Sequence, residues 1–383
     1  MRVVLGALLA AVLATAPAVP VQGAGQELLG VVILTRHGVR APTRDPAPLA
    51  PSRPWGAWPV LNYGDLTTHG EDLMRRFGVY YRNQLISDGL FAAPSCFGWR
   101  QSIYVYADTD QRTLRSAEGL LSGIGPLCGL PYHSKAGGDD PIFSAPHKAK
   151  RIANGPQLQS GSYKAAMDEL RAVLGCCALN GPQPLRVAST AAELFQLQYA
   201  QGTQVAWGRA GPDPRKFLND VIALHVLYSA VNVRSPAVAR TEGSNLASHI
   251  SATLLQIAGR GAPHFTAAYK PPASSKVVVL VGHDANLSLI GGLLGLTWAP
   301  AGFVPNDAPA GSSLAFELHR CNLTDVCVRI VFRSQTLEFM RSPSGRAAVV
   351  TANVAIPDCP GTCTLARFRA LVAQKVDVAE VRL

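Results

Sequence analysis

Three short apolar runs, each followed directly by a cluster of polar residues, constrain the fold of this chain more than any other feature. The runs cover residues 28–35, 102–108 and 276–282, and their content of β-branched residues is typical of buried strands. A long section between the second and third runs has the periodicity of helices. Strands on both sides of a helical section predict an α/β domain interrupted by a helical insertion.

The composition predicts a packed globular protein. Of 383 residues, 48% are hydrophobic and 16% are charged, which excludes a disordered polar chain. The formal net charge of +10 comes from 35 Lys and Arg against 25 Asp and Glu, and it is scattered along the chain. This distribution favours a small anionic substrate as the partner and argues against nucleic acid.

The first residues have the three parts of a secretory signal. One Arg precedes an apolar run from Val3 to about Ala14, and small residues and prolines follow. Pro17 and Pro20 end this run before it reaches the roughly 20 residues of a membrane-spanning helix. We therefore expect residues 1–23 to be a signal peptide, the mature protein to be periplasmic or secreted, and no membrane partner.

Export changes the interpretation of the eight cysteines, because an oxidising compartment favours disulfides. Two pairs each flank a predicted turn, and a third pair encloses a strand-like and a helix-like run. These three pairs are Cys321 with Cys327, Cys359 with Cys363, and Cys96 with Cys128. The pairing of the adjacent Cys176 and Cys177 stays open, since a vicinal bridge is strained.

The polar clusters after the three runs carry the candidate chemistry. The first contains Arg36, His37 and Arg40, the second contains Arg112, and the third contains His283 and Asp284. In open α/β sheets, loops at the carboxyl ends of strands converge on one crevice, so these segments can build one site. Guanidinium groups present paired donors that suit phosphate oxygens. The histidines and the aspartate would supply a nucleophile, a further donor and a proton.

Each cluster taken alone also has a purely structural interpretation. Arg-His-Gly is common in loops, His-Asp is nearly uninformative, and Asp-Gln-Arg-Thr is typical of a helix start with Asp110 as the cap. The longer pattern Arg-His-Gly-x-Arg-x-Pro is expected by chance in roughly one chain of this size in 10⁴. Its occurrence together with the other two clusters at strand ends favours a catalytic site.

With these residues the chain resembles the histidine acid phosphatases, and most of all their bacterial phytase and glucose-1-phosphatase branch. The matching segments are RHGVRAPT, GHDAN, WGAWPV, GDLTTHGEDL, DQRT, AAELFQLQYAQG, WGR and QTLEFMR, which together span nearly the whole mature chain. The resemblance implies a phosphoglycerate-mutase-like α/β domain with a smaller, mainly α domain inserted. We expect the discontinuous catalytic domain to cover residues 25–148 and 272–383, and the helical domain to cover residues 149–271.

The resemblance also implies a phosphohistidine mechanism with no metal and no cofactor. His37 is the expected nucleophile and Asp284 the expected general acid. The residues expected to bind the phosphate are Arg36, Arg40, Arg112 and His283. The residues expected to line the substrate pocket are Thr43, Arg44 and Glu193.

The expected substrate is a small phosphomonoester. The RHGVRAPT segment and the additional cation Arg44 favour phytase-type action on inositol hexakisphosphate. The alternative is a sugar-phosphate phosphatase such as a glucose-1-phosphatase, because Ala285 stands where phytases commonly carry a hydroxyl residue and Glu193 can repel a polyanion or receive a sugar hydroxyl.

Two other classes of protein fit the sequence less well. A metal-dependent phosphatase needs clustered ligands, and the nine histidines show no close ligand spacing. A non-catalytic phosphate-binding protein would need neither His37 nor Asp284. The sequence does not indicate an oligomeric state.

Overall fold

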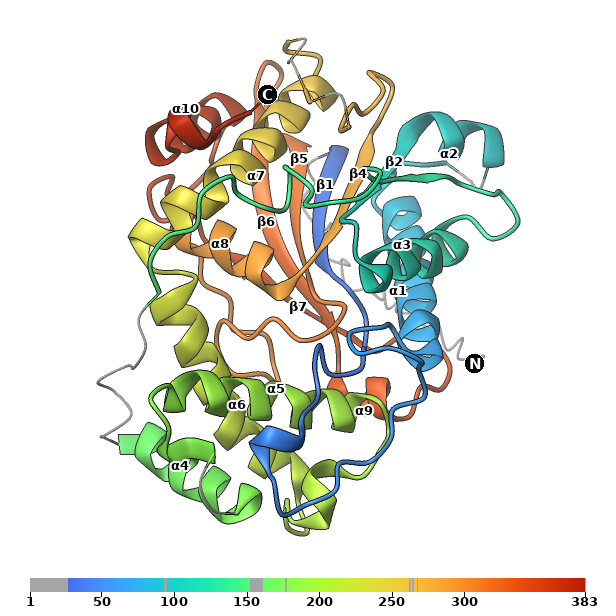
Figure 1. The fold of residues 1–383 in the computed structure, drawn as a ribbon. Helices are drawn as coiled ribbons and strands as arrows, with labels where there is room; N and C mark the ends of the chain where they lie inside the picture. The colour runs from blue at the N-terminus through green and yellow to red at the C-terminus, as the bar shows by residue number, and fades with distance from the viewer. Residues whose placement is uncertain are drawn as a thin grey trace, which may run out of the picture.

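The computed structural model describes residues 27–382 except 93–94, 152–160, 176–177, 262, 264 and 267. The expected signal peptide and the adjacent Cys176 and Cys177 therefore lie outside the described residues. Figure 1 shows a central sheet with helices on both faces and a further group of helices below one end of the sheet.

In the described part of the chain, seven strands form one mixed sheet in the order β3-β2-β4-β1-β5-β6-β7. The strands are β1 (Leu28–Arg36), β2 (Ile103–Ala107), β3 (Tyr132–His133), β4 (Val277–Gly282), β5 (Ser313–Arg320), β6 (Val326–Gln335) and β7 (Val349–Val354). The three predicted strands, β1, β2 and β4, are parallel neighbours at the centre. They are almost entirely buried because helices cover both faces, which explains their continuous apolar character.

The helices form three groups around the sheet (Figure 1). One face is covered by α1 (Thr68–Ser87), α2 (Cys96–Ser102) and α3 (Gln111–Ile124), and the other by α7 (Pro236–Ile257), α8 (Asp284–Leu294) and α10 (Leu365–Lys375). A third core is formed mainly by α4 (Gly161–Leu174), α5 (Pro184–Ala200), α6 (Pro214–Asn232) and α9 (Leu337–Arg341). The fold is thus the expected α/β core with a helical part, although α7 packs against β1 and α8.

Helices α1 and α3 approach each other unusually closely because glycines lie at their contact. A Cβ atom at Gly78 would lie 2.1 Å from the carbonyl oxygen of Leu120, and one at Gly123 would lie 1.9 Å from that of Arg75. Only residues without a Cβ allow this separation. The contact fixes α3, whose first turn carries Arg112.

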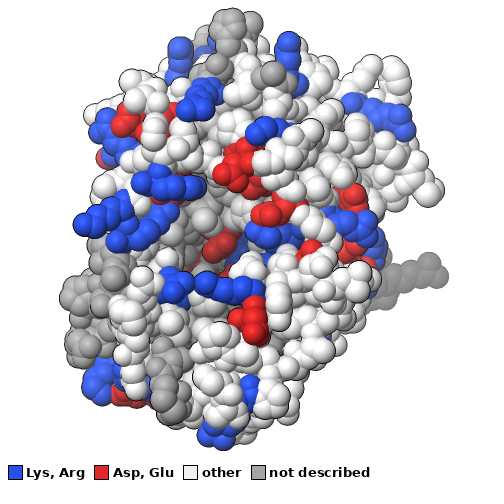
Figure 2. Space-filling view, viewed as in Figure 1, with Lys and Arg blue, Asp and Glu red and all other residues white. Residues whose placement is uncertain are grey.

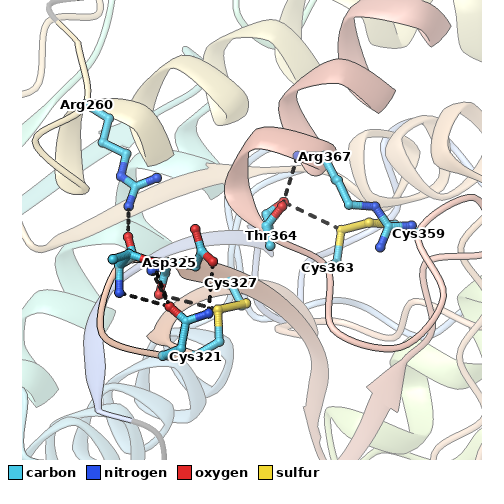
Figure 3. The surroundings of a disulfide bond; sticks show 10 residues. Arg260, Cys321, Asp325, Cys327, Cys359, Cys363, Thr364 and Arg367 are labelled. Carbon is cyan, nitrogen blue, oxygen red and sulfur yellow. Dashed lines mark hydrogen bonds between the residues drawn. A yellow bond between two sulfur atoms is a disulfide. The ribbon is translucent and has the colours of Figure 1, made fainter.

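The three expected disulfides are present. Cys96 is bonded to Cys128, and the other two bonds lie close together in Figure 3. Cys321–Cys327 closes the hairpin between β5 and β6, and the backbone N–H of Val328 donates to the carbonyl of Cys363 at 2.8 Å. Because β5 runs antiparallel to β1, this hairpin lies at the end of the sheet remote from Arg36.

No single helix in the described ranges has both the length and the apolar character to span a membrane. Only α6 and α7 taken together meet those criteria, and they are bent by 83° where they join.

A buried ion cluster joins β5 and β6. The Glu317 carboxylate accepts hydrogen bonds from His319 at 3.0 Å, from Arg329 at 2.6 and 2.9 Å, and from Arg333 at 2.5 Å. Burial by itself raises the pKa of this carboxyl, but His319 and Arg333 outweigh that effect and lower it to about 2. Glu317 therefore remains ionised at pH values where most carboxyl groups are protonated.

We predict that Glu317→Gln destabilises the fold in a pH-dependent manner. The folded-state pKa is lower than the unfolded-state pKa, so the stabilisation is complete above the unfolded value and is lost as pH falls toward 2. The difference in unfolding free energy between wild type and variant should be on the order of 3 kcal/mol near pH 6 and much smaller near pH 2. Urea unfolding at several pH values measures it. An equal difference at both ends of this range would contradict the assigned charge.

Candidate active site

The three polar clusters meet at one edge of the sheet. Arg36 is the last residue of β1 and lies opposite Gly282, the last residue of β4. His283 and Asp284 begin α8 directly after β4, and Arg112 lies in the first turn of α3 after β2. Helices α5 and α6 face this edge, and Figure 2 shows the same side of the molecule hollowed between the two parts, with basic and acidic side chains around the hollow.

One ring nitrogen of His37 is hydrogen-bonded to the backbone, and the other is available to react. Its side chain is buried, and Nδ1 lies 2.8 Å from the carbonyl oxygen of Gly38. A carbonyl only accepts hydrogen bonds, so Nδ1 carries the proton and Nε2 keeps its lone pair. The backbone is fixed by hydrogen bonds with Gly282 and Gly311, both 2.9 Å long.

The surroundings of His37 keep its ring neutral. Burial is the largest effect that lowers its pKa well below the ordinary value, and the positive charges of Arg36 and Arg40 lower it further. Neutral imidazole therefore persists at acidic pH. A neutral ring with a free Nε2 lone pair is the form in which histidine can act as a nucleophile.

Arg36, Arg40 and Arg112 lie close enough to His37 for their charges to lower its pKa. The Nη1 group of Arg36 donates to the carbonyl of Ala308 at 2.6 Å, and that of Arg40 donates to the carbonyl of Ala41 at 2.9 Å. Within the described chain, each of the three arginines has a buried Nε with no hydrogen-bond partner. Buried donors without partners indicate a place for an oxyanion.

The carboxylate of Glu193, on α5, holds two of these arginines. Its Oε1 accepts hydrogen bonds from Nη2 of Arg36 and, at 2.9 Å, from Nη2 of Arg40. Burial alone raises the pKa of Glu193, but Arg40 and Arg36 outweigh it and lower the pKa. The ionised carboxylate orients both guanidinium groups and links the helical part to the edge of the sheet.

His283 and Arg112 are each held by an aspartate that follows β2. His283 Nε2 lies 2.8 Å from Oδ2 of Asp108, and Arg112 Nη2 donates to Oδ2 of Asp110 at 2.5 Å. The rings of His37 and His283 have centroids 5.5 Å apart. The ligand atoms of Asp108, Asp110 and His283 also lie close enough together to bind one cation. The same atoms already position His283 and Arg112 through the contacts given above.

Asp284 is the most open of the catalytic candidates, with a side chain that is 29% exposed. Its Oδ1 lies 4.0 Å from Nε of Arg36, and its Oδ2 lies 3.6 Å from Nε2 of His225. Burial raises its pKa, but Arg36 and His225 together hold the pKa well below its ordinary value. Asp284 is therefore a carboxylate in this structure.

Thr43 and Arg44 line a cavity of about 200 Å³ beside the arginine cluster. Arg40 and Glu193 also line it, and Arg186 of α5 contributes a further cation. Most of the exposed lining is apolar. Two residues expected to line a substrate pocket are thus adjacent to the phosphate-binding candidates.

Sequence reasoning missed several members of this site. Asp108, Arg186 and His225 were not among the expected residues. Asp108 ends one of the predicted runs and could have been included on that ground. A single histidine within the apolar pattern of α6 gives no such signal, because only the packing of α6 against α8 brings it to Asp284.

Comparison with known proteins agrees with this geometry. Residues 27–168 match the family described as the histidine phosphatase superfamily (branch 2). The chain is 30% identical to phytase AppA of Escherichia coli, over 90% of this chain and 91% of that protein. It is 29% identical to the glucose-1-phosphatase of Salmonella typhimurium, again over 90% and 91%.

Solved structures agree in the arrangement of the chain. Hafnia alvei phytase in complex with myo-inositol hexakis sulphate has a TM-score of 0.79 and 28% identity, covering 94% of this chain and all of that chain. The phytase from Citrobacter braakii has a TM-score of 0.80 and 27% identity, with the same coverage. Together with the site, these similarities show that the chain belongs to branch 2 of the histidine phosphatase superfamily and is a histidine acid phosphatase, a phosphomonoester hydrolase.

Proposed function

We propose that the protein is an exported acid phosphomonoesterase that forms a phosphohistidine at His37 and prefers inositol hexakisphosphate. The observation that carries the reaction is a neutral His37 whose free Nε2 lies among three arginines with unpartnered, buried Nε–H groups. The three disulfides in the described residues fit an oxidising compartment, and hence a periplasmic or secreted protein. The signal peptide and the domain boundaries given above belong to the same proposal.

The reaction proceeds in two halves. Nε2 of His37 attacks phosphorus while the bond to the ester oxygen breaks, and Asp284 gives a proton to that oxygen. Water then attacks the phosphohistidine, gives its proton to Asp284, and releases inorganic phosphate and neutral His37. The arginines and His283 stabilise the charge on the non-bridging oxygens in both halves.

Substrate binding itself prepares the acid. Arg36 is the cation that lowers the pKa of Asp284 most strongly in the free protein. A bound phosphate dianion offsets this positive charge, so the pKa of Asp284 rises on binding. Proton uptake by Asp284 is then favoured at acidic pH, where His37 remains neutral.

Two cations that line the cavity beside the site support a polyanionic substrate. Arg44 and Arg186 are cations additional to those around His37, and both line this cavity. They can bind phosphates other than the one being cleaved. Relatives named as phytases favour this choice. The relative named as a glucose-1-phosphatase supports the alternative, a narrower sugar-phosphate phosphatase.

We predict that inorganic phosphate stabilises the folded protein and that Arg40→Ala removes most of this effect. A ligand that binds only the folded state adds about 2.7 kcal/mol at a concentration 100 times its Kd. Thermal unfolding with phosphate, compared with chloride at the same ionic strength, measures the effect. Equal stabilisation by the two salts, or an undiminished effect in Arg40→Ala, would argue against an oxyanion site.

We predict that His37→Ala loses at least about 10⁴-fold in kcat while keeping its fold, because the variant lacks the nitrogen that attacks phosphorus in the proposed mechanism. Rapid acid quenching followed by mass spectrometry should detect an acid-labile phosphoenzyme in wild type and not in the variant. The assays contain EDTA, so a contaminating metal-dependent phosphatase cannot supply the activity. Turnover by His37→Ala at the wild-type rate would exclude it as the nucleophile.

We predict that wild type has a higher kcat/KM for inositol hexakisphosphate than for glucose 1-phosphate, and that Arg44→Ala and Arg186→Ala each reduce this ratio. A loss of about tenfold corresponds to ~1.4 kcal/mol per cation. Arg320→Ala is the matched control, since Arg320 pairs with Glu27 at the opposite end of the sheet. A wild-type preference for glucose 1-phosphate, or an unchanged ratio in Arg44→Ala, would favour the alternative substrate.

A further inference from the structure

His225 is a buried titratable residue that the mechanism above does not use. Its side chain, on α6, is 13% exposed. Nδ1 lies 3.0 Å from the hydroxyl of Ser189 on α5, and Nε2 lies 3.6 Å from Oδ2 of Asp284. Both ring nitrogens therefore face a polar group, and one of these groups is the expected general acid.

The charges around His225 favour its protonated form. Burial acts against the cation, but the carboxylates of Asp284 and Glu193 outweigh it and raise the pKa of His225. Arg36 on β1 contacts both Glu193 and Asp284. The other polar and charged groups that act on this cluster are Ser189 and Glu193 on α5, Asp307 before β5, His37 after β1, and Arg112 on α3. Burial raises the pKa of Asp307, which weakens its contribution as an anion.

We propose that His225 shares one proton with Asp284, so that the pair, rather than the aspartate alone, serves as the proton donor to the leaving group. This proposal rests on the proposed function, because it takes Asp284 as the general acid. His225 acts through Asp284 and is a positioning residue.

The distance between the two side chains is consistent with this role. At 3.6 Å they form an ion pair rather than a direct hydrogen bond in the ligand-free cleft. Oδ1 of Asp284 is at the same time attracted by Arg36 at 4.0 Å. A bound phosphate dianion offsets the charge of Arg36, which leaves His225 as the cation that attracts Asp284, and catalytic contacts commonly shorten in such complexes.

The proton balance closes over the catalytic cycle. In mild acid the pair holds one proton, either on His225 beside a carboxylate or on Asp284 beside a neutral ring. When the P–O bond breaks, that proton reaches the ester oxygen through Asp284 and leaves as part of the alcohol. When water attacks the phosphohistidine, its proton returns to Asp284 and thus to the pair.

A shared proton has a specific effect on pH dependence. A lone aspartate loses its proton across a single pKa, and its protonated fraction then falls tenfold for each pH unit. A coupled pair that retains one proton keeps a constant fraction of that proton on Asp284 until the higher macroscopic pKa is reached. His225 therefore extends activity on poor leaving groups toward higher pH.

The test compares 2-glycerol phosphate, whose alkoxide needs a proton, with p-nitrophenyl phosphate, whose leaving group does not. The kcat of both esters is measured against pH in EDTA for wild type, His225→Gln and His147→Gln. In His225→Gln we expect the ratio of glycerol to nitrophenyl turnover, with each protein's ratio normalised to its own value at pH 3, to begin falling at a lower pH than in wild type and to be at least about tenfold below wild type at pH 6. His147, which is 70% exposed and pairs with Glu380, is the control and should leave the ratio unchanged.

Two outcomes would overturn the proposal. The first is a turnover ratio in His225→Gln that matches wild type at every pH. The second is a ratio in His225→Gln that begins to fall at a higher pH than in wild type, since His225 would then only lower the pKa of Asp284. If His225→Gln does not fold, Ser189→Ala removes the contact to Nδ1 and should shift the ratio in the same direction by a smaller factor. Failure of the proposed function is distinguishable, because wild type would then turn over neither ester and form no phosphoenzyme.

Discussion

The site depends on one carboxylate that is shared between two guanidinium groups. Arg36 and Arg40 lie near each other and near Arg112, and such a concentration of buried positive charge would be unstable without an anion. Glu193 supplies that anion from α5. Because Arg36 ends β1, Arg40 follows it, and Glu193 belongs to the helical part, the same contact orders the site and joins the two parts of the molecule.

The charges in the site give His37 and Asp284 different protonation behaviour, although both side chains would otherwise titrate in the acid range. Burial and the charges of Arg36 and Arg40 keep His37 neutral, and Arg36 together with His225 keeps Asp284 ionised. In the proposed mechanism, the nucleophile is therefore ready before substrate binds, whereas the acid becomes ready through binding. This order would couple the protonation of the site to substrate binding, and Arg36 contributes to it because its charge lowers the pKa of both groups.

The sequence predicted the elements of the fold that depend on local pattern. The strands β1, β2 and β4 are buried on both faces, so their apolar runs were easily recognised, and the clusters after them lie together because parallel strands end at one edge. The sequence analysis assigned the residues of α7 to the helical domain, because a helical pattern does not distinguish packing on the sheet from packing in a separate helical part. His225 and Arg186 were missed for a similar reason, since each reaches the site only through the tertiary packing of α5 and α6.

The contact between α1 and α3 also limits how this protein can be made more heat-resistant. Replacing helix glycines by alanine commonly stabilises a fold, since alanine is favoured by about 1 kcal/mol within a helix. At Gly78 and Gly123 the added methyl group would meet backbone carbonyl oxygens and push the helices apart. The displacement would pass along α3 to Arg112 and so to the phosphate site. Gly98 in α2, where an added Cβ meets only ordinary contacts with Ser95, offers the same helical gain without moving a catalytic group.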